Sequence, residues 1–341
     1  MNINFKKALF PLSLLYSAVV QTRQTMLSKK AVKLPRPVIS VGNISMGGTG
    51  KTPMCQFLAD YQHEKRKSAV ILTRGYKARP KSLPHLVSTT DIPEECGDEP
   101  LLLARSLKNK AHIIVDPDRV RAANWAMDHL SPDIFILDDG FQHLKVQRDK
   151  DIVILTPHDL ESGWNRVFPY GKWRENKNAL QRANFFFINL WGRNIDDVKK
   201  IVRLRPELGH TQACYFNVQI CGLKNIETKE IFQNINSRPY IVVTGIANPE
   251  KVVKSAESFL GYYAHGHLPF PDHHSFENSS LKAIKAMARE AGVQDVICTS
   301  KDAVKLKPIP GLKIWETETK FMIMDGMKDK VLKRIFQDQL S

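Results

Sequence analysis

A glycine-rich segment that ends in lysine and threonine is the clearest chemical feature of this sequence. Glycines let a backbone turn its N–H groups inward around phosphates, a lysine reaches the β- and γ-phosphates, and the next hydroxyl binds Mg²⁺. The segment follows an apolar stretch at 38–41 and precedes a helical stretch that begins near Pro53, as a phosphate loop requires. We therefore predict an ATP site at Ser45, Met46, Gly47, Gly48, Thr49, Gly50, Lys51 and Thr52. A plain strand-to-helix turn is the alternative, because Ser45 stands where the general motif has its first glycine.

Two neighbouring carboxylates, Asp138 and Asp139, follow another apolar stretch at 134–137. Carboxylates at the end of a buried strand are placed to bind a metal ion, because unpaired charges would be costly there. Successive side chains of a strand point to opposite faces, so we expect only one of the pair to face the nucleotide. The sequence therefore predicts a Mg²⁺ site that Thr52 shares with these aspartates. A solvated turn is the alternative.

Two further clusters contain groups that could accept a proton. The first is Gly97-Asp98-Glu99-Pro100, and the second contains Asp272-His273-His274. Transfer of a phosphoryl group to an alcohol needs an acceptor for the hydroxyl proton, and an aspartate paired with a histidine provides one. On spacing alone the second cluster also fits a metal site or a surface loop, and the first fits the start of a helix.

The net charge and the cysteines limit the kinds of partner and the cellular compartment that we expect for this chain. The 50 lysines and arginines against 35 aspartates and glutamates give a net charge of +15, which favours an anionic partner. The chain lacks a basic stripe interleaved with stacking aromatic residues, so we expect no nucleic-acid partner. The five cysteines are scattered without a C-x-x-C pair, which argues against a disulfide framework and a zinc site and favours a reducing compartment such as the cytoplasm.

Short apolar runs separated by helical patterns indicate the elements that must position these residues. Runs near 38–41, 69–72, 112–115, 134–137, 152–155 and 185–189 are continuous rather than alternating, as parallel strands covered on both faces require. A second series has strands near 240–243, 295–298 and 321–324 and helices near 249–259 and 279–291. We predict an α/β fold in which a P-loop nucleotide-binding domain at 31–222 carries a mostly parallel sheet with helices on both faces. A smaller α/β domain at 223–341 would close the cleft, and 76–100 would form a long loop.

The amino end combines apolar and basic residues. An apolar run at 8–20 follows Lys6 and Lys7 but is too short to span a bilayer, and 1–59 contains no acidic residue. No A-x-A cleavage pattern precedes the phosphate loop, which argues against a signal peptide. We predict that 1–30 is an amphipathic helical segment at a membrane surface. A buried core helix is the alternative.

Seven motifs together resemble the tetraacyldisaccharide 4′-kinase family, the lipid A 4′-kinases. They are G-N-I-S-M-G-G-T-G-K-T-P (42–53), L-T-R-G-Y (72–76), G-D-E-P (97–100), D-D-G-F-Q-H (138–143), G-K-W-R-E (171–175), D-H-H-S-F (272–276) and S-K-D-A-V-K-L (300–306). The resemblance implies transfer of the γ-phosphate of ATP to the 4′-hydroxyl of a tetraacylated glucosamine disaccharide 1-phosphate, which forms lipid IV A in lipid A biosynthesis. It also implies Mg²⁺ as cofactor and a place at the cytoplasmic face of the inner membrane of a Gram-negative bacterium.

The resemblance also assigns roles to individual residues. It implies that Asp98 and His273 are catalytic and that Glu99 is an additional Mg²⁺ partner. Contacts with the acceptor or with phosphate would come from Arg74, Arg119 and Arg174, because a guanidinium group suits phosphate oxygens; structural ion pairs are the alternative for each. A membrane-associated P-loop switch ATPase is the rival function, although Met46 stands where that group has its signature lysine.

Overall fold

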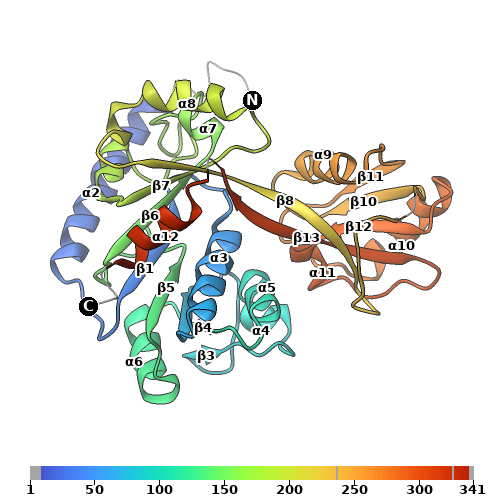
Figure 1. The fold of residues 1–341 in the computed structure, drawn as a ribbon, viewed down its shortest axis with the longest axis horizontal. Helices are drawn as coiled ribbons and strands as arrows, with labels where there is room; N and C mark the ends of the chain where they lie inside the picture. The colour runs from blue at the N-terminus through green and yellow to red at the C-terminus, as the bar shows by residue number, and fades with distance from the viewer. Residues whose placement is uncertain (1–8, 236, 325, 338–341) are drawn as a thin grey trace.

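The computed structural model describes residues 9–235, 237–324 and 326–337, and it consists of a larger and a smaller lobe (Figure 1). The helices are α2 (Phe10–Lys29), α3 (Lys51–Glu64), α4 (Pro93–Cys96), α5 (Asp98–Ser106), α6 (Arg119–Leu130), α7 (Pro157–Leu160), α8 (Ile195–Arg203), α9 (Pro249–Leu260), α10 (Asn278–Glu290), α11 (Ser300–Ala303) and α12 (Lys328–Phe336), with 3₁₀ turns η1 (Lys177–Arg182) and η2 (Pro206–Leu208). The strands are β1 (Val38–Asn43), β2 (Ala69–Thr73), β3 (His85–Leu86), β4 (Ala111–Val115), β5 (Ile134–Asp138), β6 (Lys150–Leu155), β7 (Phe185–Asn189), β8 (Ala213–Asn225), β9 (Ile231–Phe232), β10 (Tyr240–Thr244), β11 (Gly266–Pro269), β12 (Asp295–Thr299) and β13 (Lys313–Ile323).

One sheet runs through both lobes in the order β11-β10-β12-β13-β8-β7-β6-β1-β5-β2-β4-β3, with β9 paired to β8. Most neighbouring strands are parallel; β13 with β8, β8 with β9, and β3 with β4 are antiparallel. Every residue of β1, β2 and β5 is buried, because α3 and α5 pack on one face of this part of the sheet and α6 packs on the other. The predicted α/β fold, with a mostly parallel sheet between helices, is confirmed.

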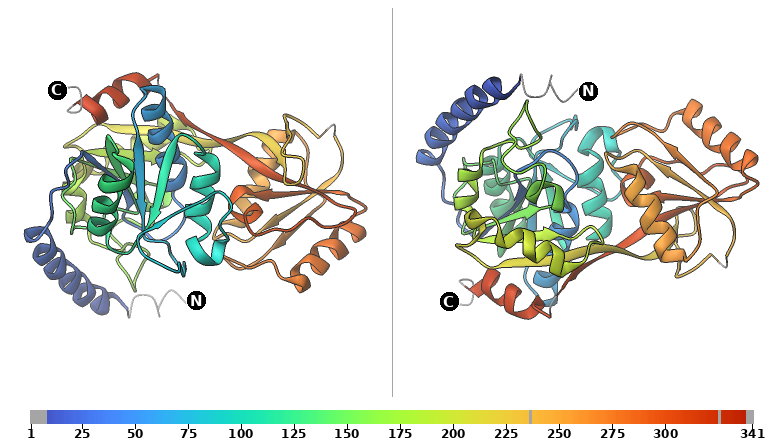
Figure 2. Two further views of the ribbon diagram at one scale, coloured as in Figure 1. Left: turned by 90° about the horizontal axis from the view of Figure 1, so that it is seen from below. Right: turned by 90° about the horizontal axis from the view of Figure 1, so that it is seen from above.

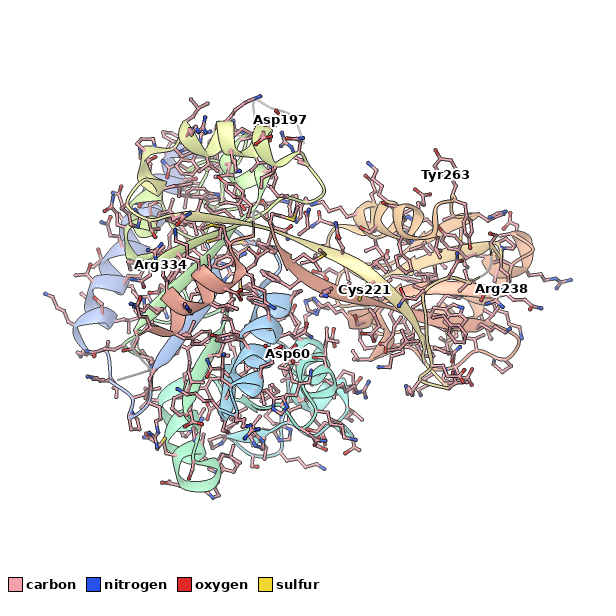
Figure 3. All side chains as sticks on the ribbon, viewed as in Figure 1. Asp60, Asp197, Cys221, Arg238, Tyr263 and Arg334 are labelled. Carbon is pink, nitrogen blue, oxygen red and sulfur yellow. The ribbon has the colours of Figure 1, made fainter. Side chains whose placement is uncertain are left out.

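The lobes are joined by a long antiparallel ribbon of β8 and β13. The pairing runs from Trp315 opposite Asn225 to Ile323 opposite Phe216, with an irregularity between Glu318 and Thr319. Cys221, on β8, lies where the ribbon passes from one lobe to the other (Figure 3). The predicted strand at 321–324 was therefore too short at its start, because the ribbon sequence E-T-E-T-K is polar and gives no continuous apolar run.

The carboxyl-terminal helix packs on the larger lobe, away from the strands that precede it in the smaller one. The residues 223–341 were expected to form only the smaller unit, but after β13 the chain returns to the larger lobe. There α12 buries Val331, Leu332 and Ile335 in the same apolar core as Leu58 of α3. The chain therefore crosses between the lobes twice. The segment 76–100, expected as a loop, also contains β3, α4 and the start of α5.

Helix α2 lies along the outside of the larger lobe (Figure 2). Its contact with the lobe combines hydrogen bonds and aromatic packing. The Ser13 hydroxyl donates to the Val167 carbonyl at 3.0 Å and accepts from the Tyr170 amide at 3.0 Å. The Tyr16 ring packs edge-on against Phe168, with centroids 5.6 Å apart. Several of its large apolar side chains are nevertheless exposed, namely Phe10, Leu12, Leu14, Leu15, Val19 and Met26. Over the described residues, no helix combines the length and apolar character needed to cross a bilayer. The expected start of this segment, with Lys6, Lys7 and Ala8, lies outside those residues.

Candidate active site

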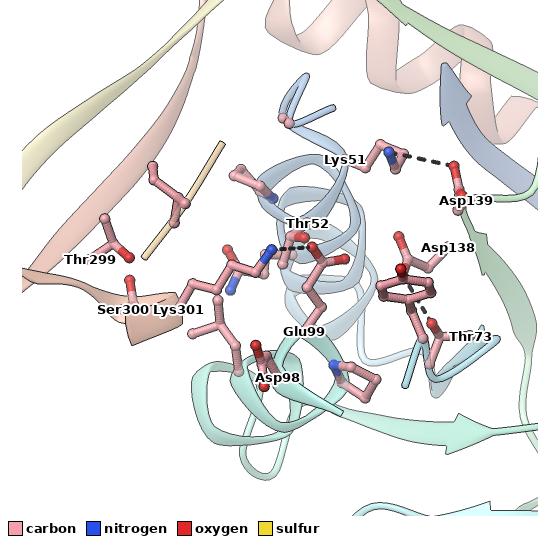
Figure 4. Close-up of a pocket in the computed structure, with 18 of the residues that line it drawn as sticks. Lys51, Thr52, Thr73, Asp98, Glu99, Asp138, Asp139, Thr299, Ser300 and Lys301 are labelled. Carbon is pink, nitrogen blue, oxygen red and sulfur yellow. Dashed lines mark hydrogen bonds and ion pairs between the residues drawn. The ribbon is translucent and has the colours of Figure 1, made fainter. Parts of the chain in front are cut away.

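A cavity of about 2020 Å³ lies between the lobes and brings together almost all the predicted site residues. The phosphate-loop residues from Met46 to Thr52 line it, as do both catalytic candidates, the three carboxylates proposed for metal binding and the three arginines. Figure 4 shows Lys51, Thr52 and Asp138 on the larger lobe and Lys301 reaching toward Glu99 from the smaller one. Ser45 does not line the cavity: it is buried, and its carbonyl accepts a hydrogen bond from the Asn43 side chain at 2.7 Å.

The phosphate loop connects β1 to the amino end of α3. Gly47 and Gly50 have φ angles of 119° and 109°, a left-handed region that favours glycine. The Asn189 side chain, at the end of β7, donates to the Thr49 carbonyl at 3.0 Å. A Cβ at Gly50 would come within 3.2 Å of that same side chain. The neighbouring strand thus holds the loop in place, and Lys51 is the first residue of the helix.

Asp139 is already held by two cations. Its carboxylate lies 3.4 Å from Lys51 Nζ and 2.8 Å from Arg174 Nη1. Burial acts in the opposite direction, but Lys51 and Arg174 together lower the pKa of Asp139. The lysine also donates to Asn43 at 3.3 Å, so its ammonium group is fixed from two sides beside the phosphate loop.

Asp138 lies in a different environment although it is the adjacent residue. It is 3 % exposed and accepts a hydrogen bond from the Thr73 hydroxyl at 3.0 Å. Burial, followed by the charges of Glu99 and Asp139, raises the pKa of Asp138 to about 6. A nearby cation would stabilise its charged form.

The oxygens around Asp138 fit a magnesium ion. Thr52, Asp138 and Glu99 offer a hydroxyl and carboxylates, the hard ligands that Mg²⁺ prefers, and phosphates and water complete its shell in nucleotide sites. The described residues contain no ready-made group of three or more His, Cys, Asp or Glu for a metal ion. The donor set therefore suits an ion that arrives with the nucleotide.

Asp98 and His273 come from different lobes and meet in the cavity. Asp98 begins α5, directly after Gly97, whose φ angle is 92°. The His273 Nδ1 lies 3.1 Å from Asp98 Oδ2, and the Tyr76 ring packs against the imidazole with centroids 5.5 Å apart. Burial opposes the effect, but His273 and Lys305 lower the pKa of Asp98. The aspartate is therefore kept as a carboxylate, the form that accepts a proton.

The three arginines differ in their surroundings. Arg174 binds Asp139 and also donates to Gln142 at 3.2 Å. Arg119 is 4 % exposed, and burial lowers its pKa; its Nε has no hydrogen-bond partner among the described residues. Arg74 is exposed at the cavity wall. Arg174 therefore matches the ion-pair alternative in part, whereas Arg119 carries a buried donor that a ligand could satisfy.

Sequence reasoning missed four residues that also line the cavity: Gln142, His143, Lys301 and Thr73. It also missed Lys305, which contacts Asp98 directly. All five belong to motifs noted for the family resemblance, but those motifs gave no role to them. Their roles depend on contacts between segments far apart in the sequence.

The half-buried His143 should make stability fall at acid pH. Burial, with Arg119 and Lys145, lowers its pKa from 6.5 to about 4, so the unfolded chain takes up the proton first. Its contribution is fully present above pH 6.5 and is lost as pH falls toward 4. We expect His143→Gln to reduce the loss of unfolding free energy between pH 7 and pH 5, measured by urea denaturation. His63→Gln, at an exposed site of α3, is the control; an equal loss in wild type and His143→Gln would contradict the expectation.

Comparisons with known proteins agree with this arrangement. A model of the tetraacyldisaccharide-1-P 4′-kinase family matches residues 5–337. A tetraacyldisaccharide 4′-kinase of Nitratidesulfovibrio vulgaris is 38% identical over 310 residues, covering 90% of this chain and 86% of the relative. One from Aquifex aeolicus is 31% identical over 338 residues, covering 97% and 99%. The crystal structure of the "apo" form of LpxK from Aquifex aeolicus in complex with ATP superposes with a TM-score of 0.75 at 29% identity, covering 98% of this chain and 99% of that one. The chain therefore belongs to the tetraacyldisaccharide-1-P 4′-kinase family.

Proposed function

We propose that this chain transfers the γ-phosphate of ATP to the 4′-hydroxyl of a tetraacylated glucosamine disaccharide 1-phosphate, the step that forms lipid IV A. The observation that carries the proposal is that residues suited to bind phosphate and residues suited to accept a proton line the same cavity. The phosphate-loop lysine, Lys51, enters from the larger lobe, and the Asp98–His273 pair spans both lobes at the same cavity. A hydroxyl bound between them would face a proton acceptor on one side and the phosphoryl donor on the other.

In this mechanism the larger lobe holds the donor. The loop amides and Lys51 bind the β- and γ-phosphates, and the ammonium group stabilises the charge that builds up on them during transfer. Asn43 and Asp139 keep the lysine at the loop before nucleotide arrives. Asp98 accepts the proton of the acceptor hydroxyl while His273 orients its carboxylate.

A magnesium ion would be held by Thr52, Asp138 and Glu99. When bound, it would supply positive charge that neutralises part of the charge of the phosphates. We do not propose Asp139 as a ligand, because two cations, Lys51 and Arg174, already pair with it, whereas Glu99 pairs with Lys301 alone. Among the two adjacent aspartates, Asp138 is thus the proposed ligand and Asp139 the residue that orients Lys51.

The acceptor carries a phosphate of its own, which suits the arginines at the cavity. Arg119 has a buried Nε to donate, and Arg74 is exposed at the wall. Guanidinium groups bind phosphate oxygens through paired hydrogen bonds. We propose that Arg119 and Arg74 contact the acceptor. Arg174 would contact phosphate while it stays paired with Asp139.

Helix α2 is proposed to bring the cavity to the cytoplasmic face of the inner membrane of a Gram-negative bacterium. Tyr16, Val20 and Leu27 of this helix line the cavity, while Leu15 and Val19 point outward and are 64 % and 60 % exposed. An acylated substrate that stays in the bilayer would reach the site along such a helix. The outward apolar side chains have the character of an interfacial anchor.

Charge placed on that outer surface should weaken membrane binding. We expect Leu15→Asp with Val19→Asp to lower partitioning into anionic phospholipid vesicles by about 10²-fold or more, because each buried aliphatic side chain contributes roughly 1.5–3 kcal/mol. Co-sedimentation at fixed salt measures it. Tyr263→Asp, at an exposed site of the smaller lobe, is the matched control (Figure 3). Unchanged vesicle binding of the double variant would exclude α2 as the anchor.

The proposed reaction is tested with purified protein, γ-labelled ATP, Mg²⁺ and a glycolipid disaccharide monophosphate in detergent micelles. Label in a chloroform-soluble product is the expected result. Label released only as inorganic phosphate without any acceptor, at a rate that rises on dimerisation, would favour the rival switch ATPase instead.

A further inference from the structure

Two lysines of the smaller lobe reach across the cavity to the G-D-E-P segment. Lys305 Nζ lies 2.9 Å from Asp98 Oδ2, and Lys301 Nζ lies 2.9 Å from Glu99 Oε1. Their side chains are only 7 % and 19 % exposed. Exposed ion pairs contribute little, but desolvating a cation is costly unless it is well paired. These pairs therefore belong to the interior of the cavity and differ from ordinary surface ion pairs.

The backbone that carries the lysines is itself held firmly. Thr299 caps α11, since its hydroxyl accepts from the Asp302 amide at 3.2 Å. The buried Asp302 carboxylate accepts in return from the Thr299 hydroxyl at 2.7 Å and from the Gly245 amide at 3.0 Å. Gly245 follows β10, and its carbonyl accepts from the His273 amide. The lysines and His273 thus belong to one rigid corner of the smaller lobe.

The donors to Asp98 converge on one oxygen. Both His273 Nδ1 at 3.1 Å and Lys305 Nζ at 2.9 Å contact Oδ2. Two donors on the same oxygen fix the rotation of the carboxylate and leave its other oxygen, Oδ1, without a contact to either of them. Two neighbouring carboxylates, Glu99 and Asp272, pair with the other lysine, Lys301.

Lys301 lies beside the other ring nitrogen of His273, and this contact bears on the tautomer of the ring. Its ammonium group lies 3.4 Å from His273 Nε2. An ammonium group has no lone pair and can only donate, so Nε2 must accept. Nδ1 then carries the hydrogen of the neutral ring and donates it to Asp98. The arrangement forms a chain of donors from Lys301 through His273 to Asp98.

We propose that Lys305 and Lys301 are positioning residues for phosphoryl transfer: Lys305 orients the Asp98 carboxylate, and Lys301 sets the tautomer of His273. The inference rests on the proposed role of Asp98. Both lysines belong to the smaller lobe. The Asp98 carboxylate is therefore oriented for proton transfer only when that lobe contacts α5. Neither lysine transfers a proton in this scheme.

Kinetics of Lys305→Met test the first part. We expect kcat to fall by about 10²-fold, the loss that a misplaced reacting group causes. The KM for ATP should stay near the wild-type value, because the phosphate loop is untouched. Lys305→Arg should recover much of the loss, and Lys307→Met, two residues away at an exposed position, should behave as wild type. Wild-type kcat in Lys305→Met, or a loss that lies in KM alone, would overturn the proposal.

A double-mutant cycle separates positioning from general damage. If Lys305 acts through Asp98, adding Lys305→Met to Asp98→Asn should cost little further activity, whereas independent effects would multiply. Multiplied losses would overturn the inference. If Asp98→Asn itself retains wild-type kcat, the proposed role of Asp98 has failed. If Asp98→Asn is impaired and Lys305→Met is not, only the present inference has failed.

The deciding measurement for the second part, the tautomer of His273, is made on the wild-type protein. In the full chain labelled with ¹⁵N-histidine, at a pH near 8 where an ordinary imidazole is neutral, long-range couplings report the tautomer of each ring. His273→Asn assigns the signal of His273. We expect the Nδ1–H form in the wild type and a mixture in Lys301→Gln. An Nε2–H form in the wild type would overturn this part of the proposal.

Discussion

Lys51→Ala is expected to reduce kcat for phosphoryl transfer by about 10²–10³-fold or more, the range seen when one preorganised electrostatic contact to a transition state is removed. The side chain is 13 % exposed and lies between Asn43 and Asp139, so its charge is already placed for the phosphates. Its loss removes that charge without any compensating group. Initial rates with γ-labelled ATP and the acylated acceptor measure the effect.

The matched control for this variant is Lys65→Ala. Lys65 lies exposed at the far end of the same helix, α3, so it removes an equal charge away from the phosphate loop. It should keep wild-type rates. Near-normal transfer by Lys51→Ala would mean that the loop between Ser45 and Thr52 does not bind the reacting phosphates.

Asp98→Asn is expected to lower kcat by about 10²–10⁴-fold, the usual contribution of a positioned general base. An amide keeps the shape of the carboxylate but accepts no proton at neutral pH. The KM for ATP should change little, because Asp98 lies across the cavity from the phosphate loop (Figure 4). Asp197→Asn, at an exposed position of α8, is the control. A wild-type kcat in Asp98→Asn would assign the proton to another group.

We expect the effect of Lys51→Ala to be at least as large as that of Asp98→Asn. Phosphoryl transfer passes through a loose transition state, so positioning and charge stabilisation contribute more than early proton removal. A smaller effect of Lys51→Ala would indicate that proton transfer limits the rate.

Much of the larger lobe could be predicted because its strands and its phosphate loop are each specified by neighbouring residues in the sequence. The strands at 69–72 and 134–137 are short apolar runs, and the structure has β2 and β5 there with one added residue each. The phosphate loop is also contiguous, since Gly50 and Lys51 are adjacent and need only a strand before them and a helix after them. Each of these features depends on side chains within a few residues of one another.

Features that depend on distant contacts could not be predicted in the same way. The ribbon strand β13 is polar over much of its length and pairs with β8 about a hundred residues earlier. Helix α12 has an apolar face, but no pattern in the neighbouring sequence predicts that this face packs against α3. The two aspartates at 138 and 139 look alike in sequence, yet only Asp138 is left with a raised pKa, because Lys51 and Arg174 reach its neighbour.

The sequence by itself determined the α/β character, the phosphate loop and the motifs that place this chain in its family, since all of these are contiguous patterns of residue type. Only the tertiary structure decided that His273, Lys301 and Lys305 meet Asp98 and Glu99. Those groups lie some 175 to 207 positions apart in the chain. Their contacts exist only where the two lobes, joined by the β8–β13 ribbon, come together, and a buried charge is stable there only when its partner from the other lobe is present.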